Sequence, residues 1–267
     1  MRDLDHPDLY HLCGVINRDI PGFELRYKDK SSLMKILGFL LAPFNPSFMD
    51  SYVTTLGKKV YFPSYKHFDS DPGRSFRILA HEYVHLCDSK SNTFFGLTYL
   101  LPQVLALLPL TAFAVVSFPY SWLALLPVVW YVLACFAFRQ SIVLFWGVLC
   151  SGLLITLGLA WLLTGWGAII LASVFLFLAP WPSPWRTKWE LRGYGMNVAI
   201  AFWLYGHLAP RHRNHITTQF TGPSYFYMCR DRGKIQAALE SYHNLAGAGI
   251  LQGRHPYDRV FKTIHRK

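Results

Sequence analysis

The chain has 267 residues, 52% of them hydrophobic and only 15% charged, with a formal net charge of +11. This length allows one or two domains, and the apolar composition argues against an ordinary soluble domain. The five cysteines are irregularly spaced and include no CxxC pair, so neither a disulfide framework nor a cysteine metal site is expected.

The first third of the chain predicts a small sheet ahead of a helix. The N-terminal residues are polar and acidic, which predicts no signal peptide. The apolar run 36–41 is too short to span a bilayer and is expected at an interface. Residues 52–63 predict a β-hairpin, because β-branched and aromatic residues flank a turn at Gly57 and Pro63 ends the run. The hairpin is either an edge strand that binds an extended peptide or a purely structural element.

An HExxH motif, His81-Glu82-Tyr83-Val84-His85, follows on a predicted helix with a start signal at 71–73. Two imidazoles four residues apart share one helical face and reach a single tetrahedral zinc, and the intervening Glu82 can polarise a metal-bound water. The alternative is an amphipathic helix with two exposed histidines. The apolar side of this helix is formed by Phe76, Leu79, Ala80, Tyr83, Val84 and Cys87, and it lies opposite His81, His85 and Asp88.

Residues 94–182 carry a single charge, Arg139, and contain about four apolar runs. A bilayer crossing needs about 20 apolar helical residues. We therefore expect a membrane insert of four crossings, with two longer kinked crossings or re-entrant hairpins as alternatives. The number of crossings must be even if residues on both sides of the insert share one metal site. The positive-inside rule then assigns that side to the cytoplasm.

The last third, 183–267, contains the expected third ligand, Glu190, on a helix. The chain has only four glutamates, and this one shares a helical face with small and polar residues: Arg186, Gly193, Tyr194, Asn197 and Ala201. The alternatives for Glu190 are a helix N-terminal acid or a partner for Arg186. Asp88 is a rival ligand but is better interpreted as a partner that orients a ligand or ends the helix. Tyr194, one turn from Glu190, is the leading candidate for stabilising an oxyanion.

The same third carries 13 basic and 4 acidic residues, which favours contact with an anionic lipid surface. Nucleic acid is not expected as a partner, because no nucleic-acid motif accompanies the charge.

The order of HExxH, hydrophobic stretch and later glutamate resembles the gluzincin type of zincin peptidase, and within it the integral-membrane heat-shock proteases and CAAX prenyl proteases. The resemblance implies that His81, His85 and Glu190 bind zinc and that Glu82 is the general base. The family's ExxAD motif has Gly193-Tyr194 in place of Ala-Asp here, and the family's upstream transmembrane helices are missing.

The predicted fold is mainly α: a zincin-like domain with a small hairpin or sheet, split by a multi-helix hydrophobic membrane insert. The expected parts are 1–93 with the HExxH helix, 94–182 as the insert, and 183–267 with the third ligand and a basic tail. The predicted function is a membrane-associated zinc endopeptidase with catalytic residues Glu82 and Tyr194, acting on a peptide or protein at the cytoplasmic side of a lipid bilayer. The alternative is a structural protein of a membrane-associated or viral assembly on a vestigial zincin scaffold.

Overall fold

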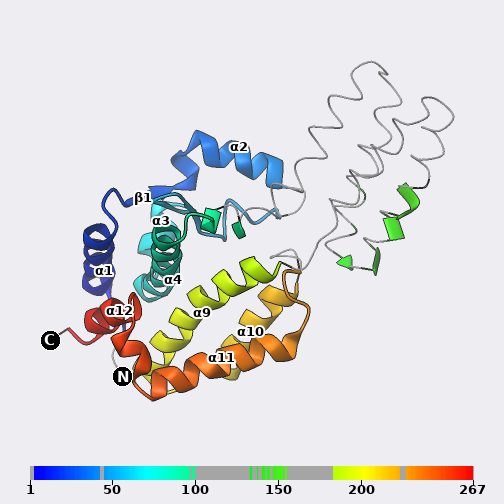
Figure 1. The fold of residues 1–267 in the computed structure, drawn as a ribbon. Coiled ribbons are helices and arrows are strands. Elements are labelled where there is room, and N and C mark those ends of the chain that lie inside the picture. The colour runs from blue at the N-terminus through cyan, green and yellow to red at the C-terminus, as the bar shows by residue number, and fades with distance from the viewer. Residues whose placement is uncertain are drawn as a thin grey trace. The chain divides into compact units, whose positions relative to one another are not determined.

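The structure is a computed structural model that describes residues 3–42, 45–96, 98–99, 183–222 and 227–266, with scattered positions between 133 and 154. The chain forms two compact units. The first combines Met1–Ala42, Pro46–Tyr99 and Ser183–Lys267, and the second comprises Pro43–Asn45 and Leu100–Pro182. Every element described below belongs to the first unit, so segments from both ends of the chain build it together (Figure 1).

Eight of the described elements precede residue 92, and each α-helix among them starts after a residue whose side chain caps it. Asp5 and Asp8 form a capping box at the first helix, and Asp71 accepts a hydrogen bond from the Arg74 N–H at the start of α4. The predicted start signal at 71–73 is thus found. The elements are α1 (His6–Asp19), β1 (Glu24–Tyr27), the 3₁₀ helix η1 (Lys28–Lys30), α2 (Ser32–Leu41), β2 (Thr54–Leu56), β3 (Lys59–Phe62), α3 (Tyr65–Asp69) and α4 (Pro72–Ser91).

The three strands form a sheet in the order β1-β3-β2, with β1 parallel and β2 antiparallel to β3. Gly57, at φ +61°, makes the tight turn between β2 and β3, as the predicted hairpin requires. Strand β2 lies at an edge of the sheet, so its outer backbone groups are available to a further strand.

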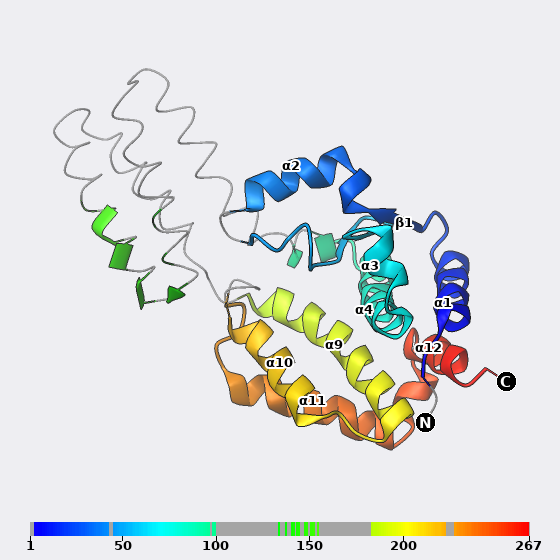
Figure 2. The same ribbon diagram turned by 180° about the vertical axis from the view of Figure 1, so that it is seen from behind.

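The C-terminal segment of the unit is helical: α9 (Pro184–Tyr205), α10 (Pro210–Thr221), α11 (Arg232–Gly247), the 3₁₀ helix η3 (Ile250–Gly253) and α12 (Tyr257–Ile264). Each of α9 and α10 has proline in its first turn, where the missing N–H costs nothing. Helix α9 ends at Gly206, whose φ of 77° closes the last turn. Figures 1 and 2 show α9, α10 and α11 gathered in one group beside α4.

Helix α4 lies at the centre of the unit, with α1 on one side and α9 on another (Figure 2). Its apolar face is buried, except for the partly exposed Cys87, as the sequence periodicity predicts. Phe76, Leu79, Ala80, Tyr83 and Val84 all have exposed fractions of 0% and belong to the largest hydrophobic core cluster. The opposite face is thereby left to the polar residues of the motif.

A buried lysine supports the segment that leads into β2. Lys28 is fully buried, donates a hydrogen bond of 2.6 Å to the Phe48 carbonyl and lies 3.6 Å from the centre of the Phe48 ring. Burial lowers the pKa of its ammonium to about 7, against the opposing charges of Glu82 and Asp50. These contacts fix the loop that carries Ser47 and Ser51 toward α4.

The predicted membrane insert needs correction. Most of 94–182 lies outside the described residues, and in the described part of the chain no helix is both long enough and apolar enough to cross a membrane. The two long helices described, α4 and α9, are interrupted by charged residues, which occur from Arg74 to Lys90 in α4 and from Arg186 to Arg192 in α9. The mainly helical fold with a small sheet is found. The membrane-split fold class and the membrane localisation are therefore contradicted in the part of the chain that the structure describes, because a crossing needs about 20 apolar helical residues and charged residues leave no such run in α4 or α9.

Candidate metal centre

The two histidines of the HExxH motif point the same way from α4. The distance between His81 Nε2 and His85 Nε2 is 3.0 Å, and their rings meet edge to face. Both residues are buried, with 7% and 2% of their surface exposed. The i, i+4 spacing therefore brings the two ligand nitrogens together, as predicted. Neither histidine is exposed, so the alternative of an amphipathic helix with two exposed histidines is wrong.

Glu190 reaches the same point from α9. Its Oε2 lies 3.4 Å from His81 Nε2 and 3.8 Å from His85 Nε2, and only 2% of its side chain is exposed. The ligand atoms of all three residues lie within 4.8 Å of one another. The structure thus joins the three predicted ligands, and this cluster could hold a metal ion.

A glycine permits this meeting of the two helices. A Cβ placed on Gly193, three residues after Glu190, would lie 2.6 Å from the His81 ring. Such a distance is far shorter than normal carbon contacts, so any larger residue must displace the ring or the helix. Position 193 is therefore restricted to glycine by its contact with the His81 ring.

The residues present fit a tetrahedral divalent ion. Ligand atoms at the bond lengths of about 2.0–2.2 Å usual for zinc lie about 3.3–3.6 Å apart in a tetrahedron. The three distances of 3.0, 3.4 and 3.8 Å bracket that spacing. Glu190 Oε2 is also buried without a hydrogen-bond partner among the described residues, which is costly unless a ligand compensates it.

The electrostatics keep the carboxylate ionised. Burial opposes the charged form of Glu190, but the imidazoles of His81 and His85 that face its carboxylate outweigh burial and hold the pKa of Glu190 well below its usual range. Burial likewise disfavours protonated His85, yet the adjacent Glu190 raises the pKa of that imidazole. The cluster therefore offers an anionic oxygen between two imidazoles.

The predicted general base, Glu82, lies beside the cluster and is positioned from the sheet. Thr55 Oγ1, on edge strand β2, donates a hydrogen bond of 2.7 Å to Glu82 Oε2. Glu82 is half-buried and lines the same cavity as His81. The role of Thr55 was not predicted, because nothing in its local sequence shows which helix the strand will face.

Tyr99 is a second contributor that the sequence did not reveal. Its hydroxyl donates a hydrogen bond to Glu190 Oε1, the oxygen that does not face the histidines. Burial raises the pKa of the Tyr99 hydroxyl well above its usual range, so it remains a donor at neutral pH. Tyr99 therefore orients the carboxylate. It is one of 15 tyrosines, and no motif distinguishes it.

Tyr194, the predicted oxyanion residue, lies next to the cluster. Its ring meets the His81 ring edge to face at 4.8 Å between centroids, and the residue lines the cavity. This contact places Tyr194 within the site. Its role toward a reacting oxygen stays a prediction.

Asp88 forms a clamp between the two helices. Its Oδ1 lies 2.8 Å from an Arg192 guanidinium nitrogen, and 2% of its side chain is exposed. It is not a member of the ligand cluster found among the described residues. Burial raises the pKa of Asp88, partly offset by Arg192. Asp88 and Arg192 thus link α4 to α9 one turn from the ligands of each helix.

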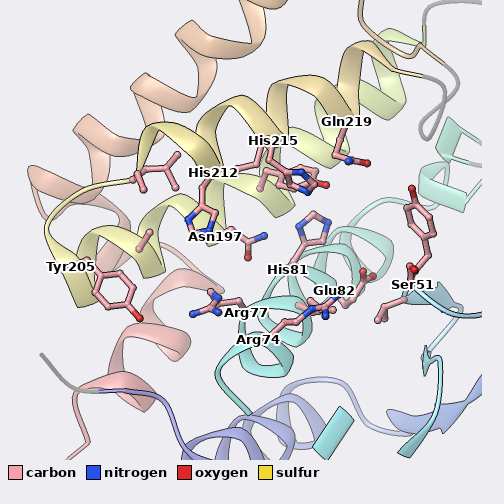
Figure 3. A pocket seen from close by; sticks show the side chains of 18 of the residues that line it. Ser51, Arg74, Arg77, His81, Glu82, Asn197, Tyr205, His212, His215 and Gln219 are labelled. Atoms are coloured by element: carbon pink, nitrogen blue, oxygen red, sulfur yellow. The ribbon is translucent and has the colours of Figure 1, made fainter. Parts of the chain in front are cut away.

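The cluster opens on one side into a cavity of about 860 Å³ (Figure 3). His81, Glu82 and Tyr194 line its inner end, and residues of the loop before β2 and of α10 line the rest. Its volume lies within the range of about 300–1,000 Å³ that is usual for small-molecule sites.

No family model, curated protein or solved structure matches this chain.

Proposed function

We propose that this protein is a zinc-dependent peptidase that hydrolyses peptide bonds. The observation that carries the proposal is the position of Glu82, an acidic side chain held by Thr55 at the mouth of a buried two-histidine, one-carboxylate cluster. Zinc enzymes that hydrolyse peptides use such a ligand set and leave a coordination position for the reaction.

His81, His85 and Glu190 would hold the ion. The bound ion would supply Lewis acidity, which lowers the pKa of water and polarises a carbonyl oxygen. Glu82 would take the proton from the attacking water and pass it to the leaving amine. Tyr99 keeps Glu190 in orientation through its hydroxyl, and Tyr194 is the candidate donor to the developing oxyanion.

The test is metal analysis combined with peptide hydrolysis by the full-length chain. Purified protein should bind one zinc per chain, and Glu190→Gln should reduce that stoichiometry. Glu82→Gln should keep the metal and lower kcat by about 10²–10⁴, the usual range for a general base. Glu240→Gln is the matched control, because this glutamate lies on α11 and 46% of its side chain is exposed.

Hydrolysis by Glu82→Gln at the wild-type rate would show that the proposal is wrong. Stoichiometric zinc with no hydrolysis of any peptide in a broad library would instead favour the alternative, a structural or assembly protein that retains a vestigial zincin site.

A further inference from the structure

The cavity beside the candidate metal centre extends along α4 toward its N-terminus. Arg74, Arg77 and His81 line it and are spaced at i, i+3 and i+7, which places them on one helical stripe. At a rise of 1.5 Å per residue, Arg77 lies about 6 Å and Arg74 about 10 Å from His81 along the axis. The stripe that ends at the metal ligands therefore begins with two guanidinium groups.

The charge of this end of the cavity is one-sided. Among the described residues that line it, Glu82 is the single acidic one, and it lies at the metal end. His212 and His215 of α10 face the two arginines across the cavity (Figure 3). An anion that enters would meet cationic and imidazole groups from both walls.

Neither arginine has an acidic partner among the described residues. Ion pairs within 4.0 Å are found for Arg26, Arg192, Arg213 and Arg259, and no such pair involves Arg74 or Arg77. Arg77 is half-buried. A partly buried guanidinium without a counter-charge loses hydration without compensation, and a carboxylate in bidentate contact would restore it.

Asn197 supplies a second polar group that lacks a partner. Its Oδ1 is buried within the cavity wall and has no hydrogen-bond partner among the described residues. Asn197 lies one turn beyond Gly193 on α9 and projects between the arginines and the histidines (Figure 3). An amide there can bond to the backbone of a peptide that follows the cavity.

We propose that this basic end of the cavity binds a carboxylate of the peptide substrate, either an acidic side chain or the C-terminal carboxylate. The inference rests on the proposed peptidase function and names its substrate class. An extended chain advances about 3.3–3.6 Å per residue, so the carboxylate would lie about two or three residues from the bond that is cleaved. Arg77 contacts it first, and Arg74 extends the site outward.

The experiment measures peptide binding, so that it does not depend on turnover. Three fluorescent peptides of equal length are titrated into the full-length Glu82→Gln protein at fixed salt, with zinc and again after chelation. One peptide carries an internal Glu and an amidated C-terminus, the second has Gln in place of that Glu, and the third has Gln with a free C-terminal carboxylate.

At least one carboxylate peptide should bind about tenfold or more tightly than the neutral one, with and without zinc, because a charge-assisted bidentate contact is stronger than a neutral hydrogen bond. The preference should disappear in a variant that combines Arg74→Gln with Arg77→Gln. It should return only in part with Lys at both positions, because Lys restores the charge but not the bidentate contact. Arg18→Gln removes one positive charge at an exposed position of α1 outside the cavity and should leave the preference intact.

Equal binding of all three peptides, no measurable binding of any, or a preference that survives in the double variant would overturn the inference. So would an equal loss in Arg18→Gln, which would reveal a response to net charge alone. Cleavage of neutral peptides by wild type but not by Glu82→Gln would leave the peptidase proposal standing in each of these cases, whereas absence of hydrolysis and of bound metal would remove that proposal itself.

Discussion

Helices α4 and α9 have similar lengths, 20 and 22 residues, yet they contribute to the candidate metal centre in different ways. Helix α4 provides two ligands through its own periodicity, so His81 and His85 would meet on this helix in any fold that kept it straight. Helix α9 provides one ligand, and Glu190 reaches the histidines only because the two helices approach closely at Gly193.

The difference teaches which part of a metal site is local and which part depends on tertiary packing. On α4 the ligand pair is a property of helix geometry. On α9 the ligand position depends on three tertiary contacts. Gly193 packs against the His81 ring, and the Tyr99 hydroxyl donates a hydrogen bond to Glu190. Arg192 pairs with Asp88. Substitutions at the contacts of α9 should therefore disturb the position of the third ligand more than substitutions on the apolar face of α4.

The largest effect is expected from Gly193→Ala. The added Cβ would lie 2.6 Å from the His81 ring, so the ligand must move or α9 must shift. Zinc affinity should fall about 100-fold, the upper range for changes that displace a ligand through its supports. Competition with a chromogenic chelator measures the affinity.

Gly195→Ala is the matched control on the same helix. Its Cβ would meet the Tyr242 ring of α11 at 2.5 Å, away from the ligands. This variant should lower the free energy of unfolding by about 1–3 kcal/mol through overpacking while changing zinc affinity much less. Equal losses of zinc affinity in both variants would contradict a specific role for Gly193.

A smaller effect is expected from Arg192→Gln, which breaks the clamp between the helices. It leaves Asp88 buried without its counter-charge, and the free energy of unfolding should fall by about 2 kcal/mol in urea titrations. Arg213→Gln breaks an ion pair with Glu240 whose side chains are 34% and 46% exposed. That loss should stay below about 1 kcal/mol, as for surface pairs in general. If Arg192→Gln lowered the free energy of unfolding no more than Arg213→Gln does, the ion pair between Asp88 and Arg192 would not be what holds α9 against α4.

The smallest effect is expected from Thr55→Val, which removes the hydrogen bond to Glu82 with little change in shape. We expect kcat to fall about tenfold, equivalent to about 1.4 kcal/mol, with KM and bound zinc nearly unchanged. Thr54→Val, the neighbouring residue whose side chain points to the other face of the strand, should have no such effect. A rise in KM alone would show that Thr55 acts on substrate rather than on Glu82.

The division between local helix geometry and tertiary packing also explains which parts of the site the sequence could predict. The histidine pair followed from spacing, the hairpin from Gly57, and Glu190 from the scarcity of glutamate in the chain together with its helical face. Thr55 and Tyr99 could not be found, because each reaches its partner across 27 and 91 residues of sequence and resembles other residues of its type. The membrane prediction is contradicted by the described residues, none of whose helices is long and apolar enough to cross a membrane, and most of the apolar runs on which it depended lie outside those residues.

The discontinuity of the first unit has a consequence for the newly made protein. His81 and His85 leave the ribosome roughly a hundred residues before Glu190, which at about 5–20 residues per second is a delay of about 5–20 seconds. Throughout that interval the nascent chain has only a histidine pair, and the third donor arrives only when the final third of the message is being read. Peptide-cleaving chemistry at this centre would therefore be withheld from an unfinished chain, and a truncated translation product ending before α9 would carry the motif without the ligand set.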